Sequence, residues 1–387
     1  MSIEKIVQYL PDILDEKFAK EACSAVLERN PKLMQFDFVG KASVKVPAIT
    51  VSGLGTYSRT DGYPSGSISV SWETFTIRND RGVKFSIDFC EDEEVNGFVL
   101  ANTASEFSRT QEIPEIDATR FSLLSQGAYV GNVGSATLTA DGGTYDVIKA
   151  FNTAIKAFED QEVPTGPNAV FFISTGVDKL LKETALISRF ITQGDYLAAN
   201  GITYKVRYYE GSPIIVVPPK RFFSAITLSG NGTGTLGGYS KASRAVALNF
   251  LYVNVNCSFP VIKHHNVSMI SPEYNNTADS YILKARVLDD LFLPTNKTYG
   301  VYVSKAVETY TVVFNANTGS GSMANQTLTL GTAAALTANT FTKSSNTFSG
   351  WNKAADGTGT DYADAASVLD LADGGSSITL YAKWTLS

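Results

Sequence analysis

Two extended segments separated by a glycine-rich stretch constrain the fold of this chain more than any other feature. Ile68, Val70 and Trp72 alternate with serines, and a period of two is typical of a strand with one buried face. This segment and an earlier one, residues 44–51, flank a tip at residues 53–66 that is rich in glycine. We therefore expect a β-hairpin with arms at residues 44–51 and 68–77.

The length of this hairpin limits where it can lie. When half of the tip is included, each arm has about 13 residues, which at about 3.3 Å per residue gives ~40 Å. A compact domain of about 300 residues has a radius of gyration near ~19 Å. The hairpin therefore either crosses the whole body or protrudes to meet another subunit. An ordinary hairpin within one sheet is the alternative.

The remainder of the body mixes helices with strands. A long helical stretch from Glu94 to about Tyr129 is expected to be interrupted at Pro114, because proline lacks the amide hydrogen that a helix needs. An amphipathic helix follows Thr144, its expected N-cap. A helix at residues 177–183 opens with a capping box at Thr175. Strands are expected at residues 169–174, 204–209, 214–217, 222–228, 245–256 and 281–288, so the fold class is α+β.

Composition and charge exclude several classes of protein. With 387 residues the chain is long enough for two or more domains. Its three cysteines lack metal or redox spacing, and its net charge of -6 is not the basic excess of a domain that neutralises phosphates. The N-terminus contains carboxylates and a proline where a secretory signal needs an apolar run. We therefore expect a soluble protein that is synthesised in a cytoplasm.

Residues that carry catalytic chemistry are sparse. The two histidines, His264 and His265, are adjacent, and in a strand they would point to opposite faces. This argues against hydrolase and zinc mechanisms, which need a histidine positioned by a partner. Residues 232–237 spell a dinucleotide fingerprint, but no convincing helix follows, so a surface loop is expected. We predict that the chain is not an enzyme and has no catalytic, cofactor-binding or metal-binding residues.

A change of composition near residue 306 marks a second domain. Thr, Ala, Gly and Ser dominate from residue 309 onwards. Aromatic residues recur there at fixed offsets, as in the segments 350–352 and 380–384, and this pattern resembles the internalin-type B repeat of bacterial surface proteins. The resemblance implies a small β-rich, β-grasp-like domain at residues 307–387. We expect four aromatic residues in its core: Phe314, Trp351, Tyr381 and Trp384. A sugar-binding pair formed by the two tryptophans is the alternative.

Three segments of the body follow one another in an informative order. They are YSRTDGYPSG (57–66) in the hairpin tip, IPEIDATRF (113–121) in the long helix, and VRYYEGSPIIVVPPKRF (206–222). This order is similar to that of tailed-phage major capsid proteins with the Hong-Kong-97-type fold. The resemblance implies an N-terminal arm (1–43), an extended hairpin loop (44–90), and peripheral and axial domains (91–306). In that family the loop contacts adjacent subunits, so the assembly residues expected at its tip are Gly53, Tyr57, Arg59, Asp61 and Tyr63.

The resemblance also implies a function. We expect a structural protein that self-assembles, as pentamers and hexamers, into the icosahedral head shell of a phage around double-stranded DNA bound without sequence specificity. Further expected partners are a portal, a separate scaffold protein and, through the C-terminal domain, a host-surface glycan or protein. The expected location is the virion capsid, after assembly in the host cytoplasm. The alternatives are an encapsulin-type compartment shell protein and a bacterial surface adhesin that carries a B repeat.

Overall fold

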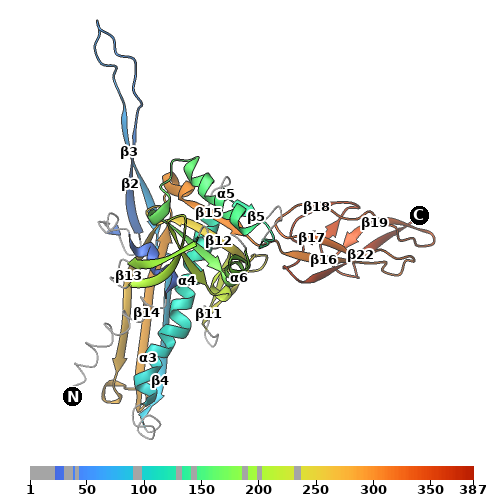
Figure 1. Cartoon of the computed structure of the whole chain (residues 1–387). Coiled ribbons are helices and arrows are strands. Elements are labelled where there is room, and N and C mark those ends of the chain that lie inside the picture. Colours follow the sequence, from blue (N-terminus) through green and yellow to red (C-terminus); the bar gives the residue numbers. More distant parts are fainter. Residues whose placement is uncertain are drawn as a thin grey trace.

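A central seven-stranded sheet organises the body, and a small β domain extends from it (Figure 1). The computed structural model describes residues 22–29, 38–39, 43–89, 98–127, 133–140, 146–184, 191–197, 203–230 and 237–387. The strand order of the sheet is β5-β15-β12-β6-β9-β8-β7. In that order the strands are Val133–Ser135, Val301–Lys305, Leu248–Asn254, Ala169–Ser174, Ser212–Val217, Thr203–Tyr209 and Ile191–Leu197.

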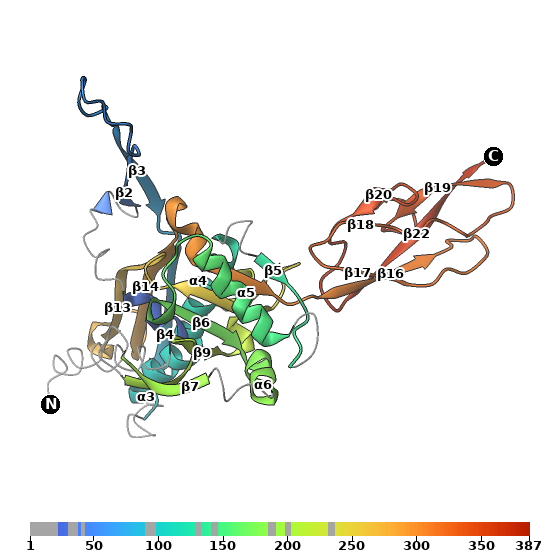
Figure 2. The ribbon, with the colours of Figure 1, turned by 45° about the horizontal axis from the view of Figure 1, so that its top comes forward.

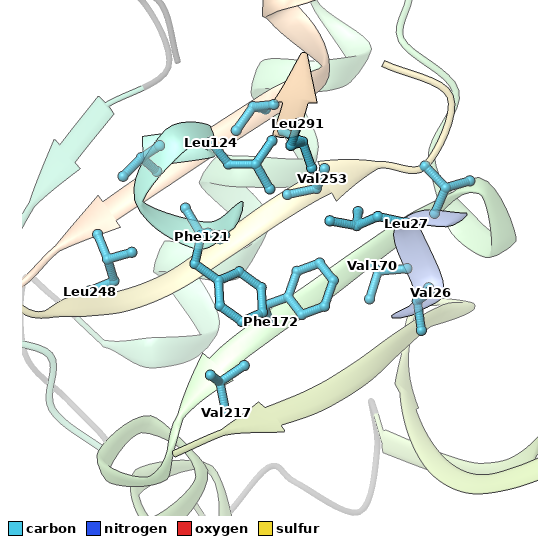
Figure 3. Close-up of a cluster of buried hydrophobic side chains, with 14 of the residues drawn as sticks. Val26, Leu27, Phe121, Leu124, Val170, Phe172, Val217, Leu248, Val253 and Leu291 are labelled. Atoms are coloured by element: carbon cyan, nitrogen blue, oxygen red, sulfur yellow. The ribbon is translucent and has the colours of Figure 1, made fainter. Parts of the chain in front are cut away.

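Strand β6 shows why this sheet lies between two layers. Val170 and Phe172 belong to one buried cluster, and Phe171 and Ile173 belong to another. A continuous apolar strand of this kind is expected where both faces of a sheet are covered. In the first cluster the rings of Phe121 and Phe172 lie 5.0 Å apart (Figure 3). The layers are formed by helix α4 (Ile113–Gly127) and the 3-10 helix η1 (Cys23–Arg29) on one side, and by α5 (Val147–Glu159) and α6 (Thr175–Glu183) on the other.

A long three-stranded sheet and a long helix form an elongated extension of the body (Figure 1). Strand β14 pairs with β13 on one side and with β4 on the other, both antiparallel. The helix packs on this sheet, and the rings of Phe85 and Phe107 lie 5.3 Å apart. The elements are β4 (Asn79–Asp88), β13 (Phe259–Ile270), β14 (Ser280–Phe292), α3 (Phe98–Phe107) and the π-helical turn η3 (Ser108–Glu112), which leads into α4.

The expected helix break at Pro114 is replaced by this π-helical turn. The Ile113 amide donates to the Ser108 carbonyl, which widens the helix just before the proline. Proline has no amide hydrogen to donate to the usual helical acceptor. A π-helical turn, in which the amide donates to a carbonyl five residues earlier, accommodates it, and the helix continues. The caps also differ from expectation, because Asp146 rather than Thr144 caps α5 and Ser174 rather than Thr175 caps α6.

The hairpin leaves the body as a protruding ribbon in both views (Figures 1 and 2). Strand β2 (Ser43–Val51) pairs with β3 (Ile68–Thr76), and β1 (Phe38–Val39) pairs only with the base of β2. The predicted arms are therefore confirmed, and the alternative of an ordinary hairpin inside a sheet of the body is wrong. Strand β4, which the sequence grouped with the extended loop at residues 44–90, lies in the β13-β14-β4 sheet instead.

The C-terminal domain contains a five-stranded sheet of order β17-β16-β22-β19-β20 and a two-stranded sheet β18-β21. Strand β15 of the body ends at Lys305 and β16 begins at Thr309, so the composition change coincides with a change of sheet. The strands are β16 Thr309–Asn315, β17 Gln326–Thr329, β18 Ala334–Ala335, β19 Asn346–Asn352, β20 Asp361–Tyr362, β21 Ser367–Val368 and β22 Ser377–Leu386.

The remaining elements are short and connect these layers. A two-stranded sheet, β10 (Ile226–Ser229) with β11 (Gly238–Lys241), lies between β9 and β12 in the chain. The 3-10 helices are η4 (Gly166–Asn168), η5 (Pro219–Arg221), η6 (Pro272–Tyr274) and η7 (Thr295–Gly300). Most of the expected N-terminal arm (1–43) and most of the fingerprint loop at 232–237 lie outside the described residues.

Candidate assembly surface and C-terminal domain

The outer half of the hairpin exposes one apolar face. In the strand register Val51 lies opposite Ile68, and Ile49 lies opposite Val70, so these side chains share one face with Trp72. Their exposed fractions range from 55% for Val70 to 77% for Ile68. The sequence pattern correctly indicated a strand with an apolar face, but no described residue of this chain covers that face.

The opposite face of the same ribbon carries small and polar side chains. Thr50 lies opposite Ser69, and Ala48 lies opposite Ser71, whose hydroxyl donates to the Ala48 carbonyl at 3.4 Å. The ribbon is therefore amphipathic along its length. An exposed contiguous apolar patch rimmed by polar residues is typical of an interaction surface.

The base of the hairpin is anchored in the body. Phe75 of β3 stacks on Phe292 with ring centroids 5.0 Å apart, and it meets the edge of Phe259 at 5.6 Å. Val44 and Ile77 are buried in the same cluster. The ribbon therefore projects from a fixed base, and its apolar outer half is held away from the core.

The tip has its own internal structure. The Ser58 and Gly62 backbones exchange hydrogen bonds of 3.1 and 2.8 Å, and the Ser58 hydroxyl donates to Asp61 at 3.0 Å. Gly62 has a φ of +82°, a conformation that glycine adopts without steric cost. The rings of Tyr57 and Tyr63 lie 5.1 Å apart in an edge arrangement. The structure therefore brings these predicted tip residues together in an ordered turn.

Two predicted tip residues make no such contacts. A Cβ atom built on Gly53 would meet nothing within 4 Å, so space does not require a glycine there. Arg59 is exposed at the turn. Neighbouring Leu54, which the sequence analysis did not single out, is a fully exposed apolar residue beyond the end of β2.

A buried ionic cluster attaches the N-terminal helix η1 to the long helix. The Asp117 carboxylate accepts hydrogen bonds from the Cys23 and Ser24 amides, each at 3.0 Å, and pairs with Arg221 at 3.1 Å. Arg120, with 1% of its side chain exposed, donates to Glu28 at 2.8 Å. Sequence reasoning missed this cluster. Its only local signal is an acidic and a basic residue three positions apart in a helix that otherwise belongs to the core.

Strand β14 adds a carboxylate to the same region. Burial raises the pKa of Asp289 to about 6, although the nearby Arg120 guanidinium opposes the shift. Atom Oδ2 of Asp289 and atoms Nε and Nη2 of Arg120 are buried without a hydrogen-bond partner. A buried ion pair contributes little net stability, but removal of one partner is costly because it leaves a buried charge uncompensated. The cluster thus joins η1 to α4, and Asp289 of β14 lies near it.

The aromatic residues predicted for the C-terminal core occupy different positions. Trp351 is completely buried, with its ring 4.8 Å from Phe314 and 5.0 Å from Phe348. Trp384 is partly buried against the same cluster, and its Nε1 donates to the Ala316 carbonyl at 2.9 Å. Tyr381 lies half-buried on the other face of the sheet, because its neighbours Leu380 and Ala382 point into the core. Burial leaves no face of Trp351 available to stack on a sugar.

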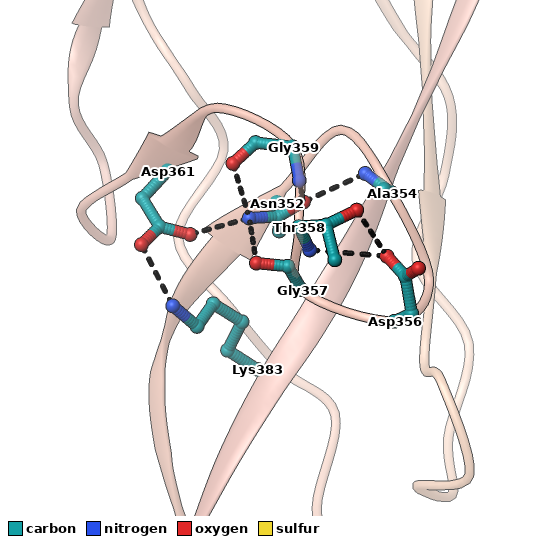
Figure 4. Close-up of polar contacts among 8 residues, drawn as sticks. All are labelled: Asn352, Ala354, Asp356, Gly357, Thr358, Gly359, Asp361 and Lys383. Carbon is teal, nitrogen blue, oxygen red and sulfur yellow. Dashed lines mark hydrogen bonds and ion pairs between the residues drawn. The ribbon is translucent and has the colours of Figure 1, made fainter.

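Asn352 organises the loop that follows the buried tryptophan (Figure 4). Its Nδ2 donates to the carbonyls of Gly357 and Gly359 and to Asp361, and its Oδ1 accepts from the amides of Ala354 and Gly359. Asp361 in turn pairs with Lys383 of β22 at 2.7 Å. Every polar atom of this fully buried amide is thus satisfied, which makes the loop a defined structural element.

Metal-ligand groups and membrane-spanning helices were sought in the described part of the chain. It holds no group of three or more His, Cys, Asp or Glu side chains suited to a metal ion. None of its helices is long and apolar enough to cross a membrane. His265 contacts Glu112 of η3 at 3.0 Å, and His264 is exposed on the opposite face of β13.

Comparison with known proteins relates both parts of the chain to described groups. The Listeria-Bacteroides repeat domain matches residues 310–383. The capsid structure of the cyanophage P-SCSP1u is similar over 70% of this chain and 84% of that chain, with a TM-score of 0.50 and 13% identity. The mature capsid of bacteriophage PhiM1 is similar over 69% of this chain and 82% of that chain, with a TM-score of 0.44 and 14% identity.

A structure from Mycobacterium phage Bobi is similar over 73% of this chain and 90% of that chain, with a TM-score of 0.45 and 14% identity. No curated protein sequence matches the chain. At such low identity the cyanophage capsid informs on the fold alone, and it agrees with the α+β capsid fold predicted from the order of segments. The chain therefore has the Hong-Kong-97-type fold of phage capsid proteins, followed by a C-terminal Listeria-Bacteroides repeat domain.

Proposed function

We propose that this chain is the major capsid protein of a tailed phage and self-assembles into an icosahedral shell around double-stranded DNA. The observation that carries the proposal is the apolar face of the hairpin, with Ile49, Val51, Ile68, Val70 and Trp72 each more than half exposed. Exposure of this apolar face to water is unfavourable, and a second copy of the chain that covered the face would remove the exposure. The capsid fold supplies the context for such a contact.

The physical logic of the shell is repetition of one contact. Each subunit presents one ribbon and receives one, and closed symmetry repeats that contact at every position. A modest free energy per contact therefore suffices, because each subunit is held by several neighbours at once. We assign to this scheme the arm (1–43), the loop predicted at residues 44–90 without strand β4, which pairs with β14, the peripheral and axial domains (91–306) together with β4, and the C-terminal domain (307–387).

The direct test is to express the full chain alone and with a candidate scaffold protein from the same genome, and to examine the product by electron microscopy. We expect closed shells built from pentamers and hexamers. Protein that stays monomeric under both conditions would contradict the proposal. Shells that require the second protein would identify it as the separate scaffold, and a portal protein is the expected partner at one vertex.

For the C-terminal domain we propose weak binding to a host-surface glycan or protein, multiplied by many copies on one shell. The support is its similarity to a bacterial repeat domain and its projection away from the body (Figure 1). Deleting residues 308–387 is expected to leave shells intact and to reduce attachment of particles to host cells. Truncated protein that no longer assembles would instead give the domain a structural role.

An encapsulin-type compartment shell is the second candidate, because it shares the fold that the structure displays. The two differ in their contents, so particles purified from the native source are to be analysed for DNA and for protein cargo. Packaged double-stranded DNA supports the phage capsid, and an enzyme cargo supports the compartment. A surface adhesin is the third candidate, and recovery of the chain from the cell wall rather than from particles would favour it.

A further inference from the structure

The connection between the body and the C-terminal domain is bonded on both sides. Ala306 donates its amide to the Ala247 carbonyl of the body at 2.9 Å, and the Glu308 carbonyl accepts from Leu330 of the C-terminal domain at 2.8 Å. The Glu308 side chain turns back toward the body. It pairs with Lys241 at 2.6 Å and accepts from the Ala247 amide at 2.8 Å. Residues 306–308 are therefore not a free linker.

A second carboxylate, far along the chain, reaches the same segment of the body. Asp373 accepts hydrogen bonds from the Arg244 amide at 2.6 Å and from the Ser243 hydroxyl at 3.0 Å. These donors lower the pKa of the Asp373 carboxyl, the Arg244 amide most strongly. Arg244 has a φ of +61°, which is uncommon for a residue with a side chain. The backbone turn at Arg244 thus directs an amide outward to the C-terminal domain.

Apolar packing and close fit complete the contact. Val246 of the body packs against the buried cluster of the C-terminal domain. Gly374, next to Asp373, leaves the space that Glu308 occupies, because a Cβ atom there would lie 2.1 Å from Glu308 Oε2. One ion pair, the hydrogen bonds accepted by two carboxylates and one apolar contact thus meet a short segment of the body at residues 241–247.

We infer that residues 241–247 form a docking site for the C-terminal domain and hold it as an arm of fixed orientation. Because the C-terminal domain contacts the body at several points, it cannot rotate about any single contact. A flexible linker would instead allow the domain to take many orientations. The C-terminal domain therefore points away from the body of the single chain in one direction (Figure 2). This inference concerns the single chain and holds whether or not the chain forms a phage shell.

The experiment compares wild type with the double variant Glu308→Ala/Asp373→Ala in the full-length protein. Hydrogen exchange of the Arg244 and Ala247 amides is the first measurement, since their acceptors are the two carboxylates. We expect exchange of both amides to become at least about tenfold faster in the variant, in line with the loss of a hydrogen bond to a charged group. Small-angle scattering, or particle images if the protein assembles, then reports whether the arm keeps one orientation.

A matched control is Asp356→Ala/Asp364→Ala, which removes the same charge from carboxylates whose hydrogen bonds stay inside the C-terminal domain. This control is expected to leave exchange at Arg244 and Ala247 unchanged. Tryptophan fluorescence, to which the buried Trp351 contributes, checks that each variant retains a folded C-terminal domain. Wild-type data that need an ensemble of arm orientations would overturn the inference, and so would equal exchange in wild type and the docking variant.

Discussion

The apolar face of the hairpin predicts that substitutions there weaken the contact between subunits and leave the stability of the single chain unchanged. We consider the double variant Ile49→Thr/Val70→Thr, because these residues lie opposite each other on that face. Threonine keeps the branched shape that strands favour, so the ribbon itself is expected to form normally. Both side chains are exposed in the single chain, and their replacement removes little buried apolar area from it.

The magnitude follows from the area that a partner could still bury. Complete burial of an isoleucine or valine side chain contributes about 1.5–3 kcal/mol. Ile49 is 67% exposed and Val70 is 55% exposed, so more than half of that contribution is available to a neighbour. The pair thus offers about 2 kcal/mol to each subunit contact. Its loss is expected to raise the protein concentration needed for assembly about 30-fold.

The assay measures the concentration at which particles appear, by light scattering with confirmation by electron microscopy. Thermal unfolding of the unassembled protein is followed in parallel and is expected to change little. The matched control is Thr50→Ser/Ser69→Thr, an opposed pair on the polar face of the same ribbon. If the apolar variant assembles at the wild-type concentration, this face is not the subunit contact and the reasoning fails.

Three further predictions concern the stability of the described parts. Asn352→Ala leaves several buried groups unpaired and is expected to lower the free energy of unfolding of the C-terminal domain by about 3 kcal/mol, measured by urea unfolding with tryptophan fluorescence. The control Asp356→Asn is expected to change this free energy by less than about 0.5 kcal/mol, and equal effects of the two variants would argue against the network. Gly350→Ala, at a φ of +138° and with its Cβ 2.7 Å from the Tyr362 carbonyl oxygen, is expected to cost more than Gly357→Ala, whose Cβ meets nothing within 4 Å; the reverse order would contradict the steric argument. The pKa of Asp289 lies above its ordinary value, so the folded state keeps this proton between about pH 4 and 6. The free energy of unfolding that this group contributes therefore falls as pH rises through that window. Asp289→Asn is expected to flatten the pH dependence of the free energy of unfolding there, and an unchanged slope would contradict the assignment.

Local patterns in the sequence predicted many elements correctly. The alternation at residues 68–72 indicated β3, and the apolar run at residues 169–174 coincides with β6. The helix of residues 147–159 is marked by apolar residues at helical spacing, all of which are buried on one face. Such patterns succeed because a strand or helix places its own side chains on a face by geometry alone.

Features that depend on distant residues were missed or shifted. The strand β13 at residues 259–270 was not predicted, since its apolar residues alternate weakly, and it is defined by pairing with β14. The attachment of η1 through Asp117 and Arg120 joins residues more than ninety positions apart. A helix can also continue through a proline by means of a π-helical turn, as this one does before Pro114.

The sequence by itself determined the α+β class, the two arms of a long hairpin with their alternating pattern, and an appended β-rich domain with aromatic core residues. Only the tertiary structure decided that the apolar face of the hairpin is left uncovered by the described chain, that β4 pairs with β14 some two hundred residues away, and that Glu308 and Asp373 meet one segment of the body. The physical reason is that side-chain periodicity is a local property of the backbone. Which faces meet depends on long-range pairing, which a single sequence does not encode in any local pattern.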